Sequence, residues 1–277
     1  MGKSIRSGRK RVVRIGAGAA TVLVAALFMS PVAANAQSTS SHGRWIYYPL
    51  GVTLQNAKFT TVAGTKSDGG CQFSESGRGG PTSVSLYEVE VALDPSTCTA
   101  KFETGTPATS ASSAPRGSSS TGGSASGVVS STTARTTAVA DPSSYQDNQW
   151  LDPFGIQVNA QEQWLSWTTG YCNISWSAKW KWSWLSADGW STRWTDSSAG
   201  ANCSRAIVST DSAFKNGIFC SGVTTYSYFG WNNSTKTKTP DHLRGYYDGT
   251  YEWDYQDFVN GGCSSLLHHG HKFSYSG

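Results

Sequence analysis

Hydrophobic and polar residues alternate strictly from Cys172 to Trp184, over thirteen positions. One parity holds Cys, Ile, Ala and four Trp residues, and the other holds Asn, Ser and Lys. Successive side chains of a β-strand point to opposite faces, so this period predicts one long strand with an indole-rich face and a polar face. The pair Asp188-Gly189 that follows is typical of a tight hairpin turn, and we expect Trp190 and Trp194 to begin the return strand.

Similar patterns continue through the C-terminal block, residues 145–277. Four dipeptides that favour hairpin turns divide this block: Asp188-Gly189, Asn216-Gly217, Asp248-Gly249 and Asn260-Gly261. No stretch of helical length shows a period of 3.6 residues. The block is therefore predicted to be an antiparallel β-sandwich or small barrel, in an all-β protein.

A second β-rich segment precedes this block. Residues 84–93 alternate like a strand, and Asp94-Pro95-Ser96-Thr97 is typical of a turn, with Pro at a position whose φ it pre-sets. Cys98, Ala100 and Phe102 then alternate on a return strand. We predict a small β-unit over residues 37–105.

A low-complexity tract separates the two β-rich segments. Residues 106–144 consist mainly of Ser, Thr, Ala and Gly and contain no aromatic residue. Such a sequence buries too little apolar surface to offset its ordering entropy, so we interpret it as a flexible linker between two modules that search independently. The alternative is a long loop within one folded unit.

The N-terminal residues 1–36 have the pattern of a secretory signal peptide. A basic segment precedes an apolar run from Ile15 to Met29, and Ala34-Asn35-Ala36 is a cleavage motif that predicts a mature start at Gln37. The chain has 22 basic and 18 acidic residues, and six of the basic ones precede residue 37, so the remainder carries a net charge of −2. This balance argues against nucleic acid and against a membrane as partners after cleavage. The signal segment itself predicts that the protein is secreted and extracellular.

Six cysteines follow the signal segment. An even number in an exported chain indicates three disulfides, and the absence of a C-x-x-C spacing argues against a structural zinc site. The tract at 106–144 leaves Cys71 and Cys98 on one side, which predicts a bridge between them. For the other four cysteines, sequential pairing is our first choice among three connectivities: Cys172–Cys203 and Cys220–Cys263.

Several short motifs resemble those of a known group of proteins. Val91-Ala92-Leu93-Asp94-Pro95-Ser96-Thr97-Cys98 and Phe214-Lys215-Asn216-Gly217-Ile218-Phe219-Cys220, with Gly261-Gly262-Cys263 and His268-His269 later, resemble a group of secreted, disulfide-bonded proteins of filamentous actinobacteria. The resemblance implies secretion and a disulfide-bonded C-terminal module. It implies no activity and no binding residue.

Tryptophan is the main functional signal, since eight of the 12 Trp residues lie between Trp164 and Trp194. We expect the indoles of the alternating strand to fill a core. Six others are candidates for stacking on sugar rings: Trp164, Trp167, Trp190, Trp194, Trp231 and Trp253. Trp164 and Trp167 are three residues apart and should face opposite sides of a strand, which leaves one of them outside the core.

Other chemistry has weaker support. There is no G-x-S-x-G motif, all cysteines are expected to be oxidised, and no motif indicates a cofactor. His269 and His271 share one face of a strand, and with His242 they define a possible Zn²⁺ or Cu²⁺ site, although an exposed polar strand end is the simpler interpretation.

We therefore expect a secreted, non-enzymatic binding protein that recognises a glycan or a cell-envelope polymer through exposed aromatic residues. The alternative is an effector that acts on an extracellular protein, as an inhibitor or an antagonistic toxin, and it predicts a large exposed apolar patch. A glycoside hydrolase is the third possibility, and it predicts two close carboxylates with one in an apolar environment.

Overall fold

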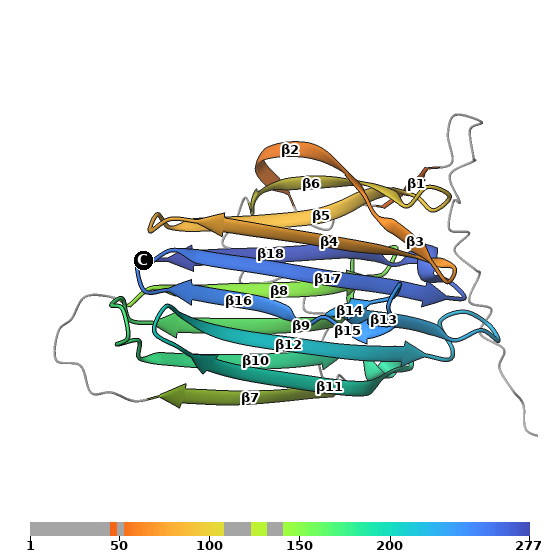
Figure 1. Ribbon diagram of the computed structural model, residues 1–277. Helices are drawn as coiled ribbons and strands as arrows, with labels where there is room; N and C mark the ends of the chain where they lie inside the picture. Colours follow the sequence, from red (N-terminus) through yellow and green to blue (C-terminus); the bar gives the residue numbers. More distant parts are fainter. Residues whose placement is uncertain (1–44, 49–52, 108–122, 132–140) are drawn as a thin grey trace, which may run out of the picture. The chain divides into compact units, whose positions relative to one another are not determined.

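The computed structural model describes residues 45–48, 53–107, 123–131 and 141–277 (Figure 1). This part of the chain is almost entirely β-structure, with two single-turn 3₁₀ helices, Ser186–Asp188 and Ser264–Leu266, and no α-helix. The strands form a nine-stranded sheet, a seven-stranded sheet and a small two-stranded sheet, and every pairing is antiparallel. The predicted all-β, antiparallel class is confirmed. The predicted signal peptide lies outside the described residues.

The larger sheet, sheet A, has the strand order β2-β6-β5-β18-β8-β9-β10-β7, with β1 paired to β5. Its strands are β1 (Ile46–Tyr47), β2 (Leu54–Ala63), β5 (Val84–Asp94), β6 (Thr99–Pro107), β7 (Gly123–Ser131), β8 (Ser143–Leu151), β9 (Gln157–Trp167), β10 (Trp176–Trp184) and β18 (His268–Ser276).

The second sheet, sheet B, has the order β11-β12-β13-β17-β4-β3, and β16 pairs with both β12 and β17. Its strands are β3 (Thr65–Ser67), β4 (Gly70–Gly79), β11 (Trp190–Ala201), β12 (Arg205–Asn216), β13 (Thr225–Phe229), β16 (Asp241–Tyr246) and β17 (Tyr251–Gly261). The two-stranded sheet consists of β14 (Trp231–Asn232) and β15 (Thr237–Lys238).

The two β-rich segments of the sequence build common sheets. Strand β5 pairs with β18 in sheet A, and β4 pairs with β17 in sheet B along nine residue pairs, from Tyr251↔Gly79 to Val259↔Cys71. The expectation of two independent modules is therefore corrected: residues on both sides of the low-complexity tract belong to one folded unit. Part of that tract, Gly123–Ser131, is strand β7, which pairs with β10, and the rest of the predicted linker up to Asp141 falls mainly outside the described residues.

The dipeptides that were predicted to form hairpin turns lie at turns, but not all of these turns connect two paired strands. Asp248-Gly249 joins β16 and β17, which pair, and Gly249 has the positive φ of 83° that such a turn requires. Two of the others lie at crossings between the sheets: Asp188-Gly189 ends the 3₁₀ turn that connects β10 to β11, and Asn260-Gly261 ends β17 before the chain continues to β18. The predicted return strand after Asp188-Gly189 thus lies in the facing sheet. The strand predicted from Cys172 begins later, at Trp176.

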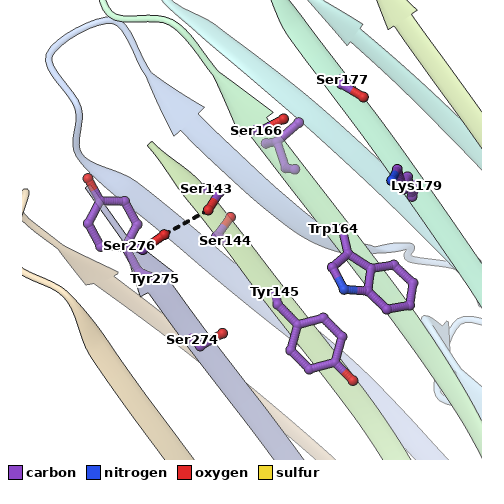
Figure 2. A pocket seen from close by; sticks show the side chains of 11 residues that line it. Ser143, Ser144, Tyr145, Trp164, Ser166, Ser177, Lys179, Ser274, Tyr275 and Ser276 are labelled. Carbon is purple, nitrogen blue, oxygen red and sulfur yellow. Dashed lines mark hydrogen bonds between the residues drawn. The ribbon is translucent and has the colours of Figure 1, made fainter. Parts of the chain in front are cut away.

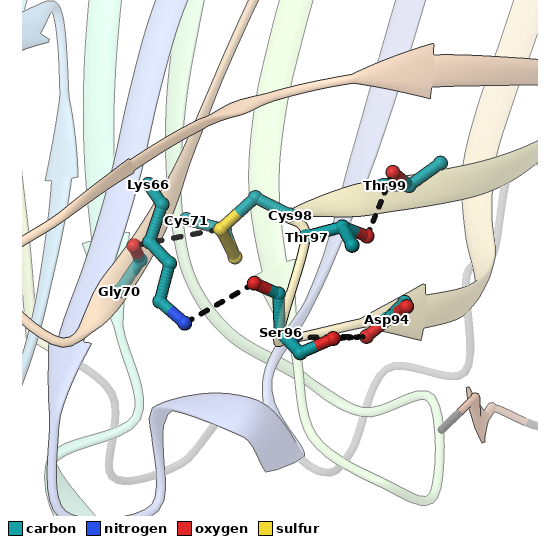
Figure 3. Close-up of a disulfide and its surroundings, with 8 residues drawn as sticks. All are labelled: Lys66, Gly70, Cys71, Asp94, Ser96, Thr97, Cys98 and Thr99. Atoms are coloured by element: carbon teal, nitrogen blue, oxygen red, sulfur yellow. Dashed lines mark hydrogen bonds between the residues drawn. A yellow bond between two sulfur atoms is a disulfide. The ribbon is translucent and has the colours of Figure 1, made fainter. Parts of the chain in front are cut away.

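All three predicted disulfides are confirmed: Cys71–Cys98, Cys172–Cys203 and Cys220–Cys263. Figure 3 shows that Cys98 follows the turn between β5 and β6 and reaches Cys71 on β4, so this bridge joins sheet A to sheet B. The turn is closed locally because Asp94 Oδ1 accepts hydrogen bonds from the backbone N–H and the hydroxyl of Ser96, at 2.9 and 2.6 Å.

The inner faces of the sheets pack together in an apolar–polar–apolar sequence. Along β18 the inward side chains run from the buried His269 and His271 to Phe273 and Tyr275, and Leu267 precedes them. The apolar ends belong to two hydrophobic clusters that combine residues of both sheets. The polar middle layer is fully buried, and its members include Asn148, Gln161, Gln163, Thr210, Ser212, Asp241, Asp257, His269 and His271.

Candidate functional site: a groove on the outer face of sheet A

Three of the six candidate indoles lie inside the protein. Trp167 is 1% exposed, Trp190 1% and Trp253 7%, and each belongs to a hydrophobic cluster between the sheets. Trp167 also packs flat against Gly245, where a Cβ atom would approach its ring to 2.1 Å. These three rings present no face to a ligand, so the predicted binding role is corrected for them.

Trp164 lies on the opposite face of β9 from Trp167, as their spacing predicts. It lines an open groove of about 550 Å³ on the outer face of sheet A, built by β8, β9, β10 and β18 (Figure 2). Tyr145 is its cross-strand partner on β8, and the two ring centroids are 5.0 Å apart. Both side chains are half-buried, and among the described residues no cation lies over either ring. The groove therefore offers two neighbouring aromatic rings to a ligand.

A row of serines runs beside the aromatic pair, two residues farther along each strand. Direct cross-strand pairing places five serines in line across five strands: Ser276, Ser143, Ser166, Ser177 and Ser130. Adjacent strands are about 4.8 Å apart, so this row spans roughly 19 Å. Figure 2 shows four of these serines on neighbouring strands, with the hydroxyls of the first two 2.8 Å apart. The row provides hydroxyl donors and acceptors along one edge of the groove.

A row of charges borders the aromatic pair on its other side. It consists of Lys272, Asp147, Glu162 and Lys181, which are successive cross-strand neighbours on β18, β8, β9 and β10. Lys272 Nζ lies 3.3 Å from Asp147 Oδ2, and Lys181 Nζ lies 3.3 Å from Glu162 Oε1. The side chain of Asp147 is 5% exposed and that of Glu162 is 17% exposed. The two central carboxylates are therefore largely covered and balanced by flanking lysines.

Hydrogen bonding links this charged row to the aromatic pair. The hydroxyl of Tyr145 donates to Glu162 Oε2 at 3.4 Å. Burial raises the pKa of Glu162, and the neighbouring Asp147 raises it further, while Lys181 opposes the shift. Burial likewise raises the pKa of the Tyr145 phenol, and the two carboxylates add to that shift. Tyr145 thus stays protonated. Its hydroxyl donates to Glu162, and this hydrogen bond fixes the position of the ring in the groove.

The remaining two candidates, Trp194 and Trp231, lie together on the outer side of sheet B. Their ring centroids are 6.1 Å apart, and they pack with Ala213, Tyr226, Tyr228 and Phe258. Lys238 Nζ lies 4.6 Å from the centroid of the Trp194 ring and forms ion pairs of 3.0 Å with Asp196 and Asp211. Arg193 lies over Tyr226 at 5.0 Å and donates to the Tyr228 hydroxyl. We refer to these residues as the capped cluster, because cations cover two of its rings, those of Trp194 and Tyr226.

The histidines do not meet as the metal-site interpretation requires. His269 lies in the polar interior, where its Nε2 is 2.7 Å from Asp257 Oδ2, whereas His242 pairs with Asp254 on the outer side of sheet B. Burial lowers the pKa of His269 to about 4 and raises that of Asp257 well above its usual range, because each charged form loses its hydration. Within the described ranges, no three His, Cys, Asp or Glu residues are arranged to hold a metal ion.

Comparisons with known proteins assign neither a family nor a function to this chain. No family model, no curated protein and no solved structure matches this chain. Over the residues that the structure describes, no helix is long and apolar enough to cross a membrane.

The groove was only partly visible in the sequence. The spacing of Trp164 and Trp167 indicated that one indole lies outside the core, but Tyr145, Lys179 and the serine row were missed. Their assembly depends on the registers of β8, β9, β10 and β18, which are set by contacts up to 133 residues apart in the chain. Ser130 and Ser143 of this row fall in the segment that was interpreted as a linker, and Ser177 falls on the predicted polar face of the alternating strand.

Proposed function

We propose that this protein is a secreted, non-enzymatic binding protein that holds a glycan strand in the groove of sheet A. The observation that carries the proposal is the pair of open rings, Tyr145 and Trp164, beside a straight row of serine hydroxyls. A pyranose ring has a flat apolar face and a polar rim. The face suits an aromatic ring, and the rim suits hydroxyl groups spaced along the strand edge.

The geometry also favours a direction for the ligand. The aromatic and serine rows both run across the strands, and rows two residues apart on one strand are separated by about 7 Å. A glycan lying across β18, β8, β9 and β10 therefore contacts both rows along its length. A groove that is open at its surface accommodates an internal stretch of a polymer without the need to enclose a chain end.

The proposal is tested by co-sedimentation of the folded protein with insoluble chitin, cellulose and peptidoglycan. We expect retention on at least one polymer and loss of that retention in Trp164→Ala. Trp194→Ala is the matched control, because it removes a half-buried indole from the capped cluster and should leave retention unchanged. Equal loss in both variants, or no retention of the wild type on any of the three polymers, would refute the proposal.

Glycoside hydrolysis is the second candidate, and the neighbouring carboxylates Asp147 and Glu162 are the observation in its favour. Directly opposed residues on antiparallel strands have Cβ atoms about 5 Å apart, near the carboxyl separation of retaining glycosidases. The burial of Asp147 and its contact with Lys272 favour a positioning role instead, because a nucleophile must touch the sugar. Release of reducing sugar from the bound polymer, abolished in Glu162→Gln, would establish hydrolysis in place of simple binding.

A further inference from the structure

The proposed glycan site contains one cation that no neighbouring carboxylate balances. Lys179 lies on β10, on the outer face of sheet A, and lines the groove (Figure 2). Its cross-strand neighbours are Trp164 on β9 and Val128 on β7, so an indole and an isopropyl group flank it. Lys179 is exposed, and within the described residues no carboxylate lies within ion-pair distance of its ammonium group.

The charges of the row next to the aromatic pair cancel. Lys181 pairs with Glu162, and Lys272 pairs with Asp147, each at 3.3 Å. The serine row beyond Lys179 contributes hydroxyls and no charge. The electrostatic potential of the groove is therefore positive at the edge of the Trp164 ring, where Lys179 is free to meet an anion of the ligand.

We infer that the groove recognises a glycan whose sugar rings bear carboxylate groups, with Lys179 as the residue that selects for them. The inference rests on the proposed glycan-binding function and names its substrate class. A sugar ring stacked on Trp164 places its exocyclic substituents around the rim of the indole. A carboxylate at that rim accepts charge-assisted hydrogen bonds from the Lys179 ammonium, whereas a neutral ester does not form an ion pair.

The experiment compares a galacturonate oligomer with the same oligomer as its methyl ester, by calorimetric titration of the folded protein. We expect the wild type to bind the acid about 5-fold more tightly than the ester, the magnitude of one charge-assisted contact. Lys179→Gln should reduce the ratio of acid to ester affinity to about 1, and Lys179→Arg should retain the preference. The preference should also weaken when salt is raised, because the ion pair is exposed.

Lys215→Gln is the matched control, since it removes an exposed lysine from β12 in sheet B and should change neither affinity. Equal binding of acid and ester by the wild type, with no effect of Lys179→Gln, would overturn the inference and leave glycan binding in the groove intact. If the protein binds neutral polymers but not the acidic oligomer, the inference about carboxylated sugars is likewise overturned, and the proposed glycan binding stands. Failure to bind these oligomers and every insoluble polymer would refute the proposed function as well.

Discussion

Two sets of aromatic side chains lie on the outer faces of the two sheets, and they differ in what covers their rings. In the groove of sheet A, Tyr145 and Trp164 are half-buried and contact each other, and among the described residues no cation lies over either ring. In the capped cluster of sheet B, Lys238 covers Trp194 and Arg193 covers Tyr226. Both sets arise from similar Trp-rich strands. The difference shows that exposure of an indole does not by itself make a binding platform, because the ring face must also be free.

The charges around the two sets have different partners. Lys238 is fixed by Asp196 and Asp211, so its cation–π contact is part of a surface network. In the groove, the paired lysines lie in the neighbouring row, and Lys179 lies beside Trp164 with no carboxylate within ion-pair distance among the described residues. A lysine therefore covers an aromatic ring in the capped cluster, whereas in the groove Lys179 has no ion-pair partner among the described residues.

The largest effect is expected for an indole that belongs to neither surface. Trp182 is 4% exposed, packs in a hydrophobic cluster and donates from Nε1 to Gln161 Oε1 at 3.0 Å. Trp182→Ala should cost about 3–5 kcal/mol of unfolding free energy, because it leaves a cavity and removes one of the two hydrogen bonds that the buried Gln161 Oε1 accepts, the other coming from the Ser212 hydroxyl. Trp164→Ala and Trp194→Ala should each cost much less. Chemical denaturation measures all three, and a stable Trp182→Ala protein would contradict the assignment of this indole to the core.

The buried polar layer should make stability depend on pH. Burial raises the pKa of Glu90 to about 8, and in the unfolded chain this carboxyl releases its proton near 4.5. The folded state therefore holds more protons between these values, and this contribution to stability falls as the pH rises from about 4.5 to about 8. Burial lowers the pKa values of His268 and His269 to about 3 and 4, so their contribution is lost as the pH falls below about 6.5.

Glu90→Gln isolates the acidic part of this dependence. Gln keeps an oxygen for the backbone N–H of His269, which Glu90 Oε2 accepts at 3.0 Å. The melting temperature of the variant should exceed that of the wild type by several degrees at pH 8 and by less at pH 5. Parallel curves for the two proteins across this range would contradict the account. The result also separates any loss of glycan binding at pH 8 from loss of fold.

A smaller effect is expected for the hydroxyl that holds the groove ring in place. Tyr145→Phe keeps the aromatic face and removes the hydrogen bond to Glu162, so glycan affinity should fall about 2–5-fold with little change in stability. Tyr228→Phe removes the equivalent contact with Arg193 in the capped cluster and should leave affinity unchanged. A loss in Tyr228→Phe alone would move the binding surface to sheet B.

Local patterns predicted the strands and the disulfides well, for a physical reason. Alternation in residues 176–184 matches the burial of Ala178 and Trp182 and the exposure of Lys179 and Lys181, although the other three indoles of this strand are only half-buried. The turn at Asp94-Pro95 brings Cys98 back toward its partner. Pairing between distant segments leaves no such local trace. The registers of β4 with β17 and β5 with β18 unite segments that composition alone assigned to separate modules.

The interior was the least predictable region. Gln161 and Gln163 share a parity with the buried Leu165 and Trp167, and polar residues at such positions break the alternation that marks a buried face. They are accommodated because other strands supply partners, as when Gln161 Nε2 donates to Asp241 Oδ2 at 2.7 Å. For the same reason the face of Trp164 could be inferred only relative to Trp167, and the groove around it could not.

The central claim is that ligand contacts the open aromatic pair and not the capped cluster. It is tested most directly by indole N–H resonances of the ¹⁵N-labelled protein, titrated with a soluble oligomer of the polymer that retains it. The resonance of Trp164, assigned through Trp164→Ala, should shift progressively with ligand, and those of Trp194 and Trp231 should stay in place. Shifts at Trp194 and Trp231 with an unchanged Trp164 would contradict the claim and locate the binding surface on sheet B.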